Sequence, residues 1–238
     1  MTEKLKTYLN WSSGKDAALA LYHLQKNNQL EVDRLVTTIN THFDRVTMHG
    51  LQRQLLEEQA AAIGLPLDTI ELPQSPTMEA YDLILQKEMQ SFVEAGYTHC
   101  GFGDIFLEDL RQYRETQLAQ VNLQGIFPLW KRDTKLLLEE FLALGFRAVV
   151  LCLNAQLLDE SFLGREIDAN FMKDLPAGVD PCGENGEFHT FCFDGPIFNY
   201  PVEFELGEKV FRSYPQPKQA DNSAVQEMGF WFCDLIPK

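Results

Sequence analysis

In the first half of the chain, short apolar runs alternate with longer segments whose apolar residues recur at helical spacing. The strand-like runs are 7–11, 35–39, 67–71 and 99–103, and the helical segments between them are 16–25, 49–63, 78–94 and 108–120. Strands that alternate with helices are joined by right-handed crossovers and form a parallel sheet. The pattern therefore predicts an α/β fold, a parallel sheet with flanking helices.

The second half begins in the same way and then changes. A strand is expected at 125–129, a helix at 135–144, a strand at 148–153, and a helical segment over 157–175 with a break near Gly164. After Pro176, the pattern predicts antiparallel strands at 188–193, 202–206, 209–213 and 230–235, with a tight turn at Gly207-Glu208. We therefore predict two domains, 1–125 and a smaller one at 126–238.

The charge of the chain limits the partners that it can have. Of its 238 residues, 35 are acidic and 20 are Lys or Arg, which gives a net charge of −15. So acidic a surface repels a phosphate backbone and argues against broad nucleic-acid binding. A local basic pocket for one nucleotide remains compatible with it.

The cysteines and the N-terminus indicate the compartment. The five cysteines are odd in number and include no C-x-x-C pair, which favours reduced thiols over disulfides or structural zinc. The segment 1–6 is polar and charged, and no apolar run is long enough to cross a bilayer. We expect a cytoplasmic protein with no membrane association.

The first chemical motif is Trp-Ser-Ser-Gly-Lys-Asp-Ala at 11–17, where the first strand meets the first helix. A helix N-terminus offers free N–H groups and the positive end of its dipole to phosphate. Ser12 and Ser13 add hydroxyls, Gly14 allows close approach, Lys15 adds charge, and Asp16 can hold magnesium. The alternative is a serine-capped helix after a turn. Neither the Walker A pattern nor G-x-G-x-x-G is present.

The second motif is Asp-Pro-Cys-Gly-Glu-Asn-Gly-Glu-Phe-His-Thr-Phe at 180–191, just before a predicted strand. Glu184 and Glu187 could orient a cation or perform acid–base work, and His189 could shuttle a proton. The alternative is an acidic, glycine-rich loop that merely enters a strand, and for Cys182 a buried thiol. The density of polar groups favours a site.

These two motifs carry a resemblance to a known family. The segment 12–17 resembles the S-G-G-x-D-S signature of PP-loop ATP pyrophosphatases, and together with the second motif it resembles the diphthine–ammonia ligase family. The similarity continues through the segments 48–50, 103–105, 128–130 and 163–165 and through Arg111, Arg114, Glu115 and Asp133. It implies a Rossmann-like (HUP/PP-loop) ATP-binding domain followed by a substrate-binding domain.

The resemblance also implies a reaction and its cofactors. The family uses ATP and Mg²⁺ to adenylate a carboxylate, releases AMP and pyrophosphate, and transfers ammonia to the activated carboxylate of diphthine on elongation factor 2. The acceptor is therefore expected to be a carboxylate, either protein-borne diphthine or a small molecule. The oligomeric state is left open, and the chain could form a homodimer.

Four positions depart from the family pattern. Ser13 replaces a glycine, Ala17 replaces a serine and removes a hydroxyl, and Asn185 and His189 replace Gly and Glu in the Glu-Gly-Gly-Glu-Tyr-Glu-Thr string. The variant resembles a bacterial-type branch, and bacteria lack diphthamide. ATP chemistry is therefore better supported than diphthine as the substrate.

Roles follow for individual residues. Lys15, Asp16, Glu184, Glu187 and His189 are the catalytic candidates, and Asp16 is the metal ligand. Four residues keep a second interpretation. Arg111 and Arg114 could clamp phosphate or pair with Glu108 and Glu115. His49 could face the nucleotide or only begin a helix, and Trp130 could stack on a ligand or fill the domain junction. The nucleotide site is expected to comprise Ser12, Ser13, Gly14, Lys15, Asp16, Thr38, Ile39, Asn40, His49, Gly103, Asp104, Arg111 and Arg114, and the acceptor site Trp130, Glu184, Asn185, Gly186, Glu187, His189 and Thr190.

Two other functions remain open. A PP-loop enzyme that modifies tRNA would share the first motif, although the acidic charge and the lack of C-x-x-C pairs argue against it. A non-catalytic ATP-binding sensor would fit the hydroxyl lost at Ala17.

Overall fold

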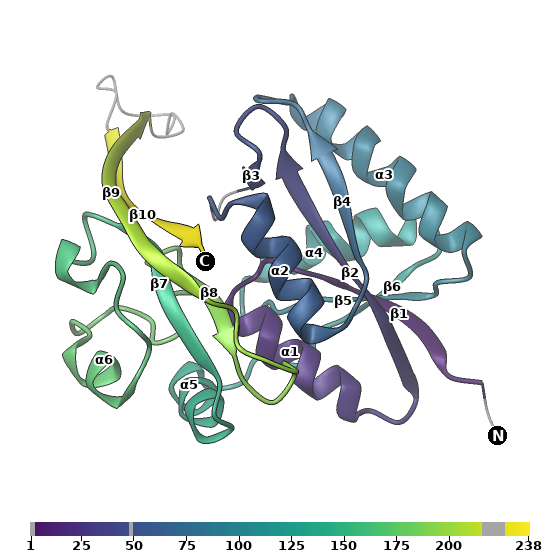
Figure 1. Ribbon diagram of the computed structural model, residues 1–238. Coiled ribbons are helices and arrows are strands. Elements are labelled where there is room, and N and C mark those ends of the chain that lie inside the picture. Colours follow the sequence, from purple (N-terminus) through teal and green to yellow (C-terminus); the bar gives the residue numbers. More distant parts are fainter. Residues whose placement is uncertain (1–2, 48–49, 216–226) are drawn as a thin grey trace.

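The computed structural model describes residues 3–47, 50–215 and 227–238 (Figure 1). The first half of the chain forms a six-stranded sheet in which every strand but one is parallel to its neighbours. The parallel strands lie in the order β4-β2-β1-β5-β6, and the short β3 pairs antiparallel with the end of β2. The strands are β1 (Leu5–Asn10), β2 (Leu30–Asn40), β3 (Arg45–Val46), β4 (Leu67–Leu72), β5 (His99–Gly101) and β6 (Gln124–Ile126).

Two pairs of helices cover the two faces of this sheet (Figure 1). The helices α1 (Lys15–Lys26) and α2 (Arg53–Ile63) lie on one face, and α3 (Met78–Glu94) and α4 (Glu108–Ala119) lie on the other. Successive strand residues point to opposite faces, so Tyr8 packs with Phe92 of α3, whereas Leu9 joins the core that contains α1 and α2.

The second half forms a four-stranded antiparallel sheet in the order β8-β7-β10-β9. These strands are β7 (Arg147–Asn154), β8 (Phe188–Asp194), β9 (Phe204–Pro215) and β10 (Glu227–Pro237), and the helices are α5 (Thr134–Ala143), η1 (Glu160–Phe162) and α6 (Ala169–Asp174). The predicted fold class, a Rossmann-like parallel sheet followed by a smaller antiparallel part, is confirmed.

One hydrophobic core joins the two sheets. It contains Leu9 of β1, Leu21 of α1, Leu56 of α2, and Val150 and Phe191 of the second sheet, all of them buried. Helices α1 and α2 therefore lie between the sheets (Figure 1). The boundary predicted at residue 125 falls inside β6 and stays a prediction.

Two expectations for the second half are wrong. Most of 157–175 is not helical: only η1 and the short α6 form, and 163–167 runs along β7, where the Gly164 and Ile167 N–H groups donate to the carbonyls of Val150 and Ala148. The strands expected at 202–206 and 209–213 are the single strand β9. Gly207-Glu208 is an irregularity opposite Asp234 in the pairing with β10, not a turn.

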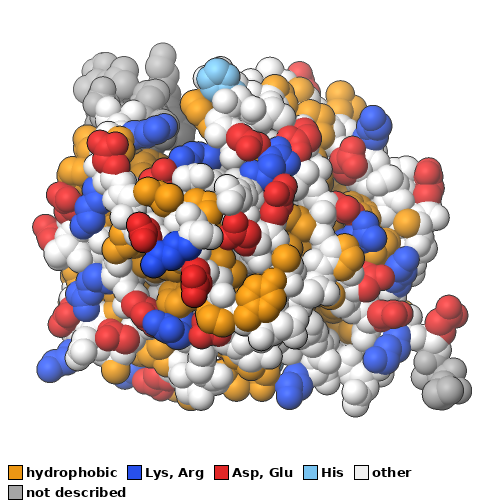
Figure 2. Space-filling view, viewed as in Figure 1, with side chains coloured by type: hydrophobic (Ala, Val, Ile, Leu, Met, Phe, Trp, Pro, Cys, Tyr) orange, Lys and Arg blue, Asp and Glu red, His pale blue; other side chains and the backbone are white. Residues whose placement is uncertain are grey.

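The surface carries charges of both signs. Figure 2 shows Asp and Glu side chains interspersed with Lys and Arg over the face seen in Figure 1. Within the described ranges, no helix is both long and apolar enough to cross a membrane.

Candidate functional site

The loop that follows β1 lies at the point where the order of the parallel strands reverses, with β2 on one side and β5 on the other. In open α/β sheets, ligands bind at such a point, outside the carboxyl ends of the strands. Gly103, just after β5, approaches this loop so closely that a Cβ atom there would lie 2.9 Å from the backbone of Asp16 and Ala17. The absence of a side chain at Gly103 therefore lets the two loops meet.

Ser13, the residue that replaces glycine in the family signature, has a left-handed backbone with φ of 68°. Such a conformation is strained for a residue with a Cβ atom. Its carbonyl accepts hydrogen bonds from Gln59 Nε2 at 3.0 Å and from the Cys192 N–H at 2.9 Å. Its buried Oγ has no hydrogen-bond partner among the described residues. The loop is thus held by its backbone rather than by the serine hydroxyl.

The first turn of α1 is capped from the other sheet. Gly14 occupies the N-cap position and has no side chain to cap the helix. Thr190 of β8 supplies the cap, because its Oγ1 accepts a hydrogen bond from the Lys15 N–H at 3.1 Å. This hydroxyl would lie 3.3 Å from a Cβ atom on Gly14, so a hydroxyl is present at the loop although Ala17 has none.

Lys15 and Asp16 form an ion pair at the start of α1. The Lys15 ammonium contacts both Asp16 oxygens, at 2.9 and 2.7 Å, and donates to the carbonyl of Cys182 in the second motif. Burial is the largest single effect and lowers the pKa of Lys15, but the charge and the hydrogen bond of Asp16, together with other nearby acidic groups such as Glu184, raise that pKa above its ordinary value. Lys15 is therefore charged at neutral pH.

Glu184 connects the second motif to the loop after β5. Its Oε1 accepts hydrogen bonds from the N–H groups of Ile105 at 2.7 Å and Phe106 at 3.4 Å. Burial raises the pKa of Glu184 to about 7, and the negative charges of Asp16 and Asp104 act in the same direction. A carboxyl group with such a pKa can both accept and release a proton near neutral pH.

Glu187 is buried and organises its own loop. Its Oε1 accepts from the Asp180 N–H at 2.9 Å, its Oε2 accepts from the Asn185 N–H at 2.9 Å, and the Asn185 side chain adds a third bond at 3.2 Å. Among the described residues, Glu187 is absent from the lining of the large cavity beside it. Its carboxylate therefore shapes the loop that carries Glu184 and Asn185.

His189 lines the large cavity, and burial lowers its pKa to about 4, with the positive charge of Lys15 acting in the same direction. The imidazole is accordingly neutral at physiological pH.

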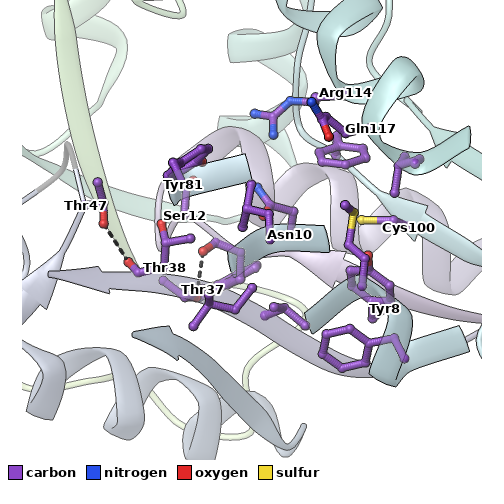
Figure 3. A pocket seen from close by; sticks show the side chains of 18 of the residues that line it. Tyr8, Asn10, Ser12, Thr37, Thr38, Thr47, Tyr81, Cys100, Arg114 and Gln117 are labelled. Atoms are coloured by element: carbon purple, nitrogen blue, oxygen red, sulfur yellow. Dashed lines mark hydrogen bonds between the residues drawn. The ribbon is translucent and has the colours of Figure 1, made fainter. Parts of the chain in front are cut away.

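Two cavities meet at residues 12–16, the segment that leads from β1 into α1 and that we call the phosphate-type loop. The larger, about 950 Å³, lies between the two sheets and is lined by Lys15, Asp16, Glu184 and His189. The smaller, about 240 Å³, lies between the sheet and the helices α3 and α4. Both are lined by Asn10, Ser12 and Arg114. Figure 3 shows Asn10 and Ser12 beside the smaller cavity, with Arg114 and Gln117 of α4 facing it from the helix.

The predicted nucleotide residues are distributed unevenly around these cavities. Thr38 lines the smaller cavity, and its carbonyl accepts from the Thr47 hydroxyl at 3.2 Å (Figure 3). Ile39 is buried in the core. Asn40 lines a separate hollow of about 340 Å³ between β2 and the β9–β10 strands. His49 lies outside the described residues.

The two predicted arginines have different surroundings. Arg114 forms an ion pair with Asp104 at 2.6 Å and lines both cavities. Arg111 pairs with Glu115 at 2.8 Å and lies 4.6 Å from the ring centroids of both Phe127 and Trp130. Within the described part of the chain, neither Arg111 nor Trp130 is in the lining of the two cavities.

Of the remaining predicted residues, Gly14, Gly103, Asp104, Asn185, Gly186 and Thr190 all line the larger cavity. Sequence reasoning missed its apolar wall, which Met228, Phe230 and Phe232 form from alternate positions of β10. Their period-2 spacing on a strand was the available signal.

Comparisons with known proteins find relatives for both halves of the chain. The model of the diphthamide synthase N-terminal domain matches residues 5–121, and that of the diphthamide synthase C-terminal domain matches residues 133–216. The chain belongs to the diphthamide synthase family. Among relatives in this family, the diphthine–ammonia ligase of Danio rerio is 28% identical over 179 residues, which cover 67% of this chain and 69% of the relative.

The mammalian relatives in the diphthamide synthase family match a shorter segment. The diphthine–ammonia ligases of Homo sapiens and Bos taurus are each 29% identical over 141 residues, or 57% of this chain. The matching segment spans about half the length of these two relatives, 50% in each case. The resemblance predicted from the two motifs is thus confirmed at the level of the family.

Proposed function

We propose that this chain is an ATP-dependent ligase, which adenylates a carboxylate with release of pyrophosphate and then transfers ammonia or an amine to it. The observation that carries the proposal is the position of the Ser12–Asp16 loop. It begins a helix at the junction of two cavities that share Asn10, Ser12 and Arg114. A nucleotide in one cavity and an acceptor in the other would meet at this loop.

The triphosphate would lie against the N-terminus of α1. The helix dipole, the backbone N–H groups and the charged Lys15 favour an anion there. Asp16, whose side chain is 29% exposed, would hold magnesium together with phosphate oxygens, since magnesium binds through one or two carboxylates and substrate phosphates. The described residues contain no group of three or more His, Cys, Asp or Glu placed to hold a metal, so the phosphates would complete the site. Magnesium would neutralise charge on the departing pyrophosphate.

The nucleoside would occupy the smaller cavity. Its wall combines apolar side chains with the rings of Tyr81 and Phe102 and the side chain of Thr38. Tyr81 and Thr38 are labelled in Figure 3. Such a mixture suits a purine, which needs stacking surface and a few hydrogen-bonding groups. Arg114 would lie where the nucleoside joins the phosphates.

The acceptor would enter the larger cavity. Its carboxylate oxygen attacks the α-phosphorus, the bond from that phosphorus to the bridging oxygen breaks, and pyrophosphate leaves. Ammonia then attacks the carbonyl carbon and AMP departs. Glu184, with its pKa of about 7, would accept the proton that the attacking nitrogen loses. The loop held by Glu187 would position Glu184 and Asn185 for this step.

The relatives supply the best-supported acceptor class, because their names specify diphthine and ammonia. We propose a carboxylate acceptor of that kind, either protein-borne or small, and a reaction in the cytoplasm, where ATP is abundant.

Product analysis with ATP labelled at the α and γ positions tests the proposal. The protein would be incubated with magnesium, ammonium and a panel of carboxylates that includes a diphthine-containing protein. We expect AMP and pyrophosphate, and we expect Asp16→Ala to abolish their formation while Asp109→Ala, on the exposed start of α4, does not. Formation of ADP would overturn the mechanism. Bound but unchanged ATP with every acceptor would support a sensor instead.

A further inference from the structure

Gln59 of α2 is completely buried, and both ends of its amide are in use. Its Nε2 donates to the carbonyl of Ser13 at 3.0 Å and to the carbonyl of Cys192 at 2.5 Å. Its Oε1 accepts a hydrogen bond from the indole N–H of Trp11 at 2.7 Å. One side chain therefore joins the end of β1, the phosphate-type loop and β8.

The residue that Gln59 holds is the strained one. Ser13 has φ of 68°, and a residue with a Cβ atom adopts this conformation only where its surroundings enforce it. The Ser13 hydroxyl contributes nothing to that enforcement, since it has no hydrogen-bond partner among the described residues. The backbone of Ser13 is restrained at its carbonyl, which accepts hydrogen bonds from Gln59 Nε2 and from the Cys192 N–H.

We infer that Gln59 is a positioning residue, which compensates for serine at a place where a glycine would adopt the left-handed conformation without strain. By fixing the Ser13 carbonyl, Gln59 sets the orientation of the peptide groups that begin α1. By binding Cys192 as well, it fixes the loop relative to β8, which carries His189 and Thr190. This inference rests on the proposed function, since the loop matters only if it binds phosphates.

Gln59 acts through other residues and not on a ligand. Among the described residues, it is absent from the lining of both cavities that meet at the loop. Its removal should therefore affect the phosphate part of a nucleotide and leave the nucleoside part alone. A merely structural role would weaken both parts together.

Calorimetric titration of the full chain with magnesium-ATP and with adenosine tests the inference. Gln59→Met keeps the length of the side chain and removes both hydrogen-bonding ends. We expect it to weaken binding of magnesium-ATP by roughly 10- to 100-fold, by analogy with the loss seen when partners that orient metal ligands are removed. Adenosine binding should be unchanged. Gln54→Met is the matched control, because Gln54 is exposed on the same helix and, among the residues that the structure describes, its side chain bonds only to Glu58.

A second substitution separates the restraint on Ser13 from general packing. In a Ser13→Gly background, Gln59→Met should cost much less ATP affinity, since glycine adopts positive φ without strain. Gln59→Glu has no donor and would place its carboxylate against the Ser13 and Cys192 carbonyls, so it should weaken ATP binding at least as much as Gln59→Met.

The outcomes distinguish this inference from the proposed function. If the unaltered protein does not bind magnesium-ATP, the proposed function fails. If it binds and Gln59→Met binds equally well, or loses ATP and adenosine alike, the positioning role is overturned. Should Gln59→Met not fold, Ser13→Gly alone should bind magnesium-ATP at least as tightly as the unaltered protein, and weaker binding would overturn the inference.

Discussion

The hydroxyl of Thr190 accepts a hydrogen bond from the backbone N–H of Lys15 at 3.1 Å, across 175 positions of sequence. The helix that begins at the phosphate-type loop is thus capped by a strand of the other sheet. The second motif therefore contributes to the nucleotide site as well as to the acceptor cavity.

Replacement of Thr190 by valine should destabilise the protein and weaken nucleotide binding. Valine has the shape of threonine but leaves the Lys15 N–H without its buried acceptor, and loss of an N-cap costs about 1 kcal/mol. Urea unfolding measures the stability and titration with magnesium-ATP measures the affinity. Thr190→Ser, which keeps the hydroxyl, should behave nearly like the unaltered protein, and equal losses for both variants would contradict the capping role.

Arg114 and Arg111 lie on the same helix and should respond differently to replacement. Arg114 lines both cavities, whereas Arg111 stacks beside Trp130 and pairs with Glu115. Arg114→Ala should weaken magnesium-ATP binding roughly 10- to 100-fold, since a hydrogen bond to a charged group contributes about 1.5–3 kcal/mol. Arg111→Ala should leave the dissociation constant unchanged. The same loss in both variants would show that the phosphates extend along α4.

Glu184 should make the stability depend on pH in a defined direction. Its pKa is about 7 in the folded protein and near the ordinary value of 4.5 when unfolded, so the folded state holds the proton more tightly. Its contribution is therefore most favourable below pH 4.5 and is lost as the pH rises through about 7. This difference in pKa corresponds to a contribution of about 3 kcal/mol to the free energy of unfolding.

The difference in unfolding free energy between the unaltered protein and Glu184→Gln isolates this contribution. Urea unfolding between pH 5 and pH 8 should show the unaltered protein losing stability relative to the variant as the pH rises. A difference that does not change with pH would mean that Glu184 titrates normally.

Glu187 should be needed for the shape of its loop. Glu187→Gln replaces one acceptor oxygen by an NH₂ group that faces a backbone N–H of Asp180 or Asn185. An unsatisfied buried donor costs about 1–3 kcal/mol, and urea unfolding should detect that loss. Asn185→Ala, which removes only one of the three bonds, should cost less. If Glu187→Gln is as stable as the unaltered protein, the loop is held by other contacts.

The regular elements of the first half could be predicted because local patterns determine them. Helix α3 runs from Met78 to Glu94, the predicted range, since apolar residues at helical spacing follow the Thr77 cap. The strand–helix junction at 12–16 could be predicted because it follows a local pattern, and its role in binding phosphate stays a prediction. In the second half, the helix expected over 157–175 is interrupted because 163–167 lies along β7, a tertiary pairing that the local sequence pattern does not reveal.

The contacts between the two motifs could not be predicted, because they depend on how the sheets face each other. Hydrogen bonds join Lys15 and Ile105 of the first half to Thr190, Glu184 and the Cys182 carbonyl of the second. These bonds require both sheets to be in place. One feature of the sequence points to Gln59. Its spacing from Leu55 and Leu56 places this polar side chain on the apolar face of α2. A buried polar residue needs partners, and its partners are part of the site.

The core that passes through α1 and α2 from one sheet to the other limits how this protein can be divided. A gene fragment that ended after β6 would present the apolar flank of these two helices to water, and such a product should aggregate. Although each half matches a family model of its own, neither half is an exchangeable module, and recombination within the family should succeed only where both halves are inherited together.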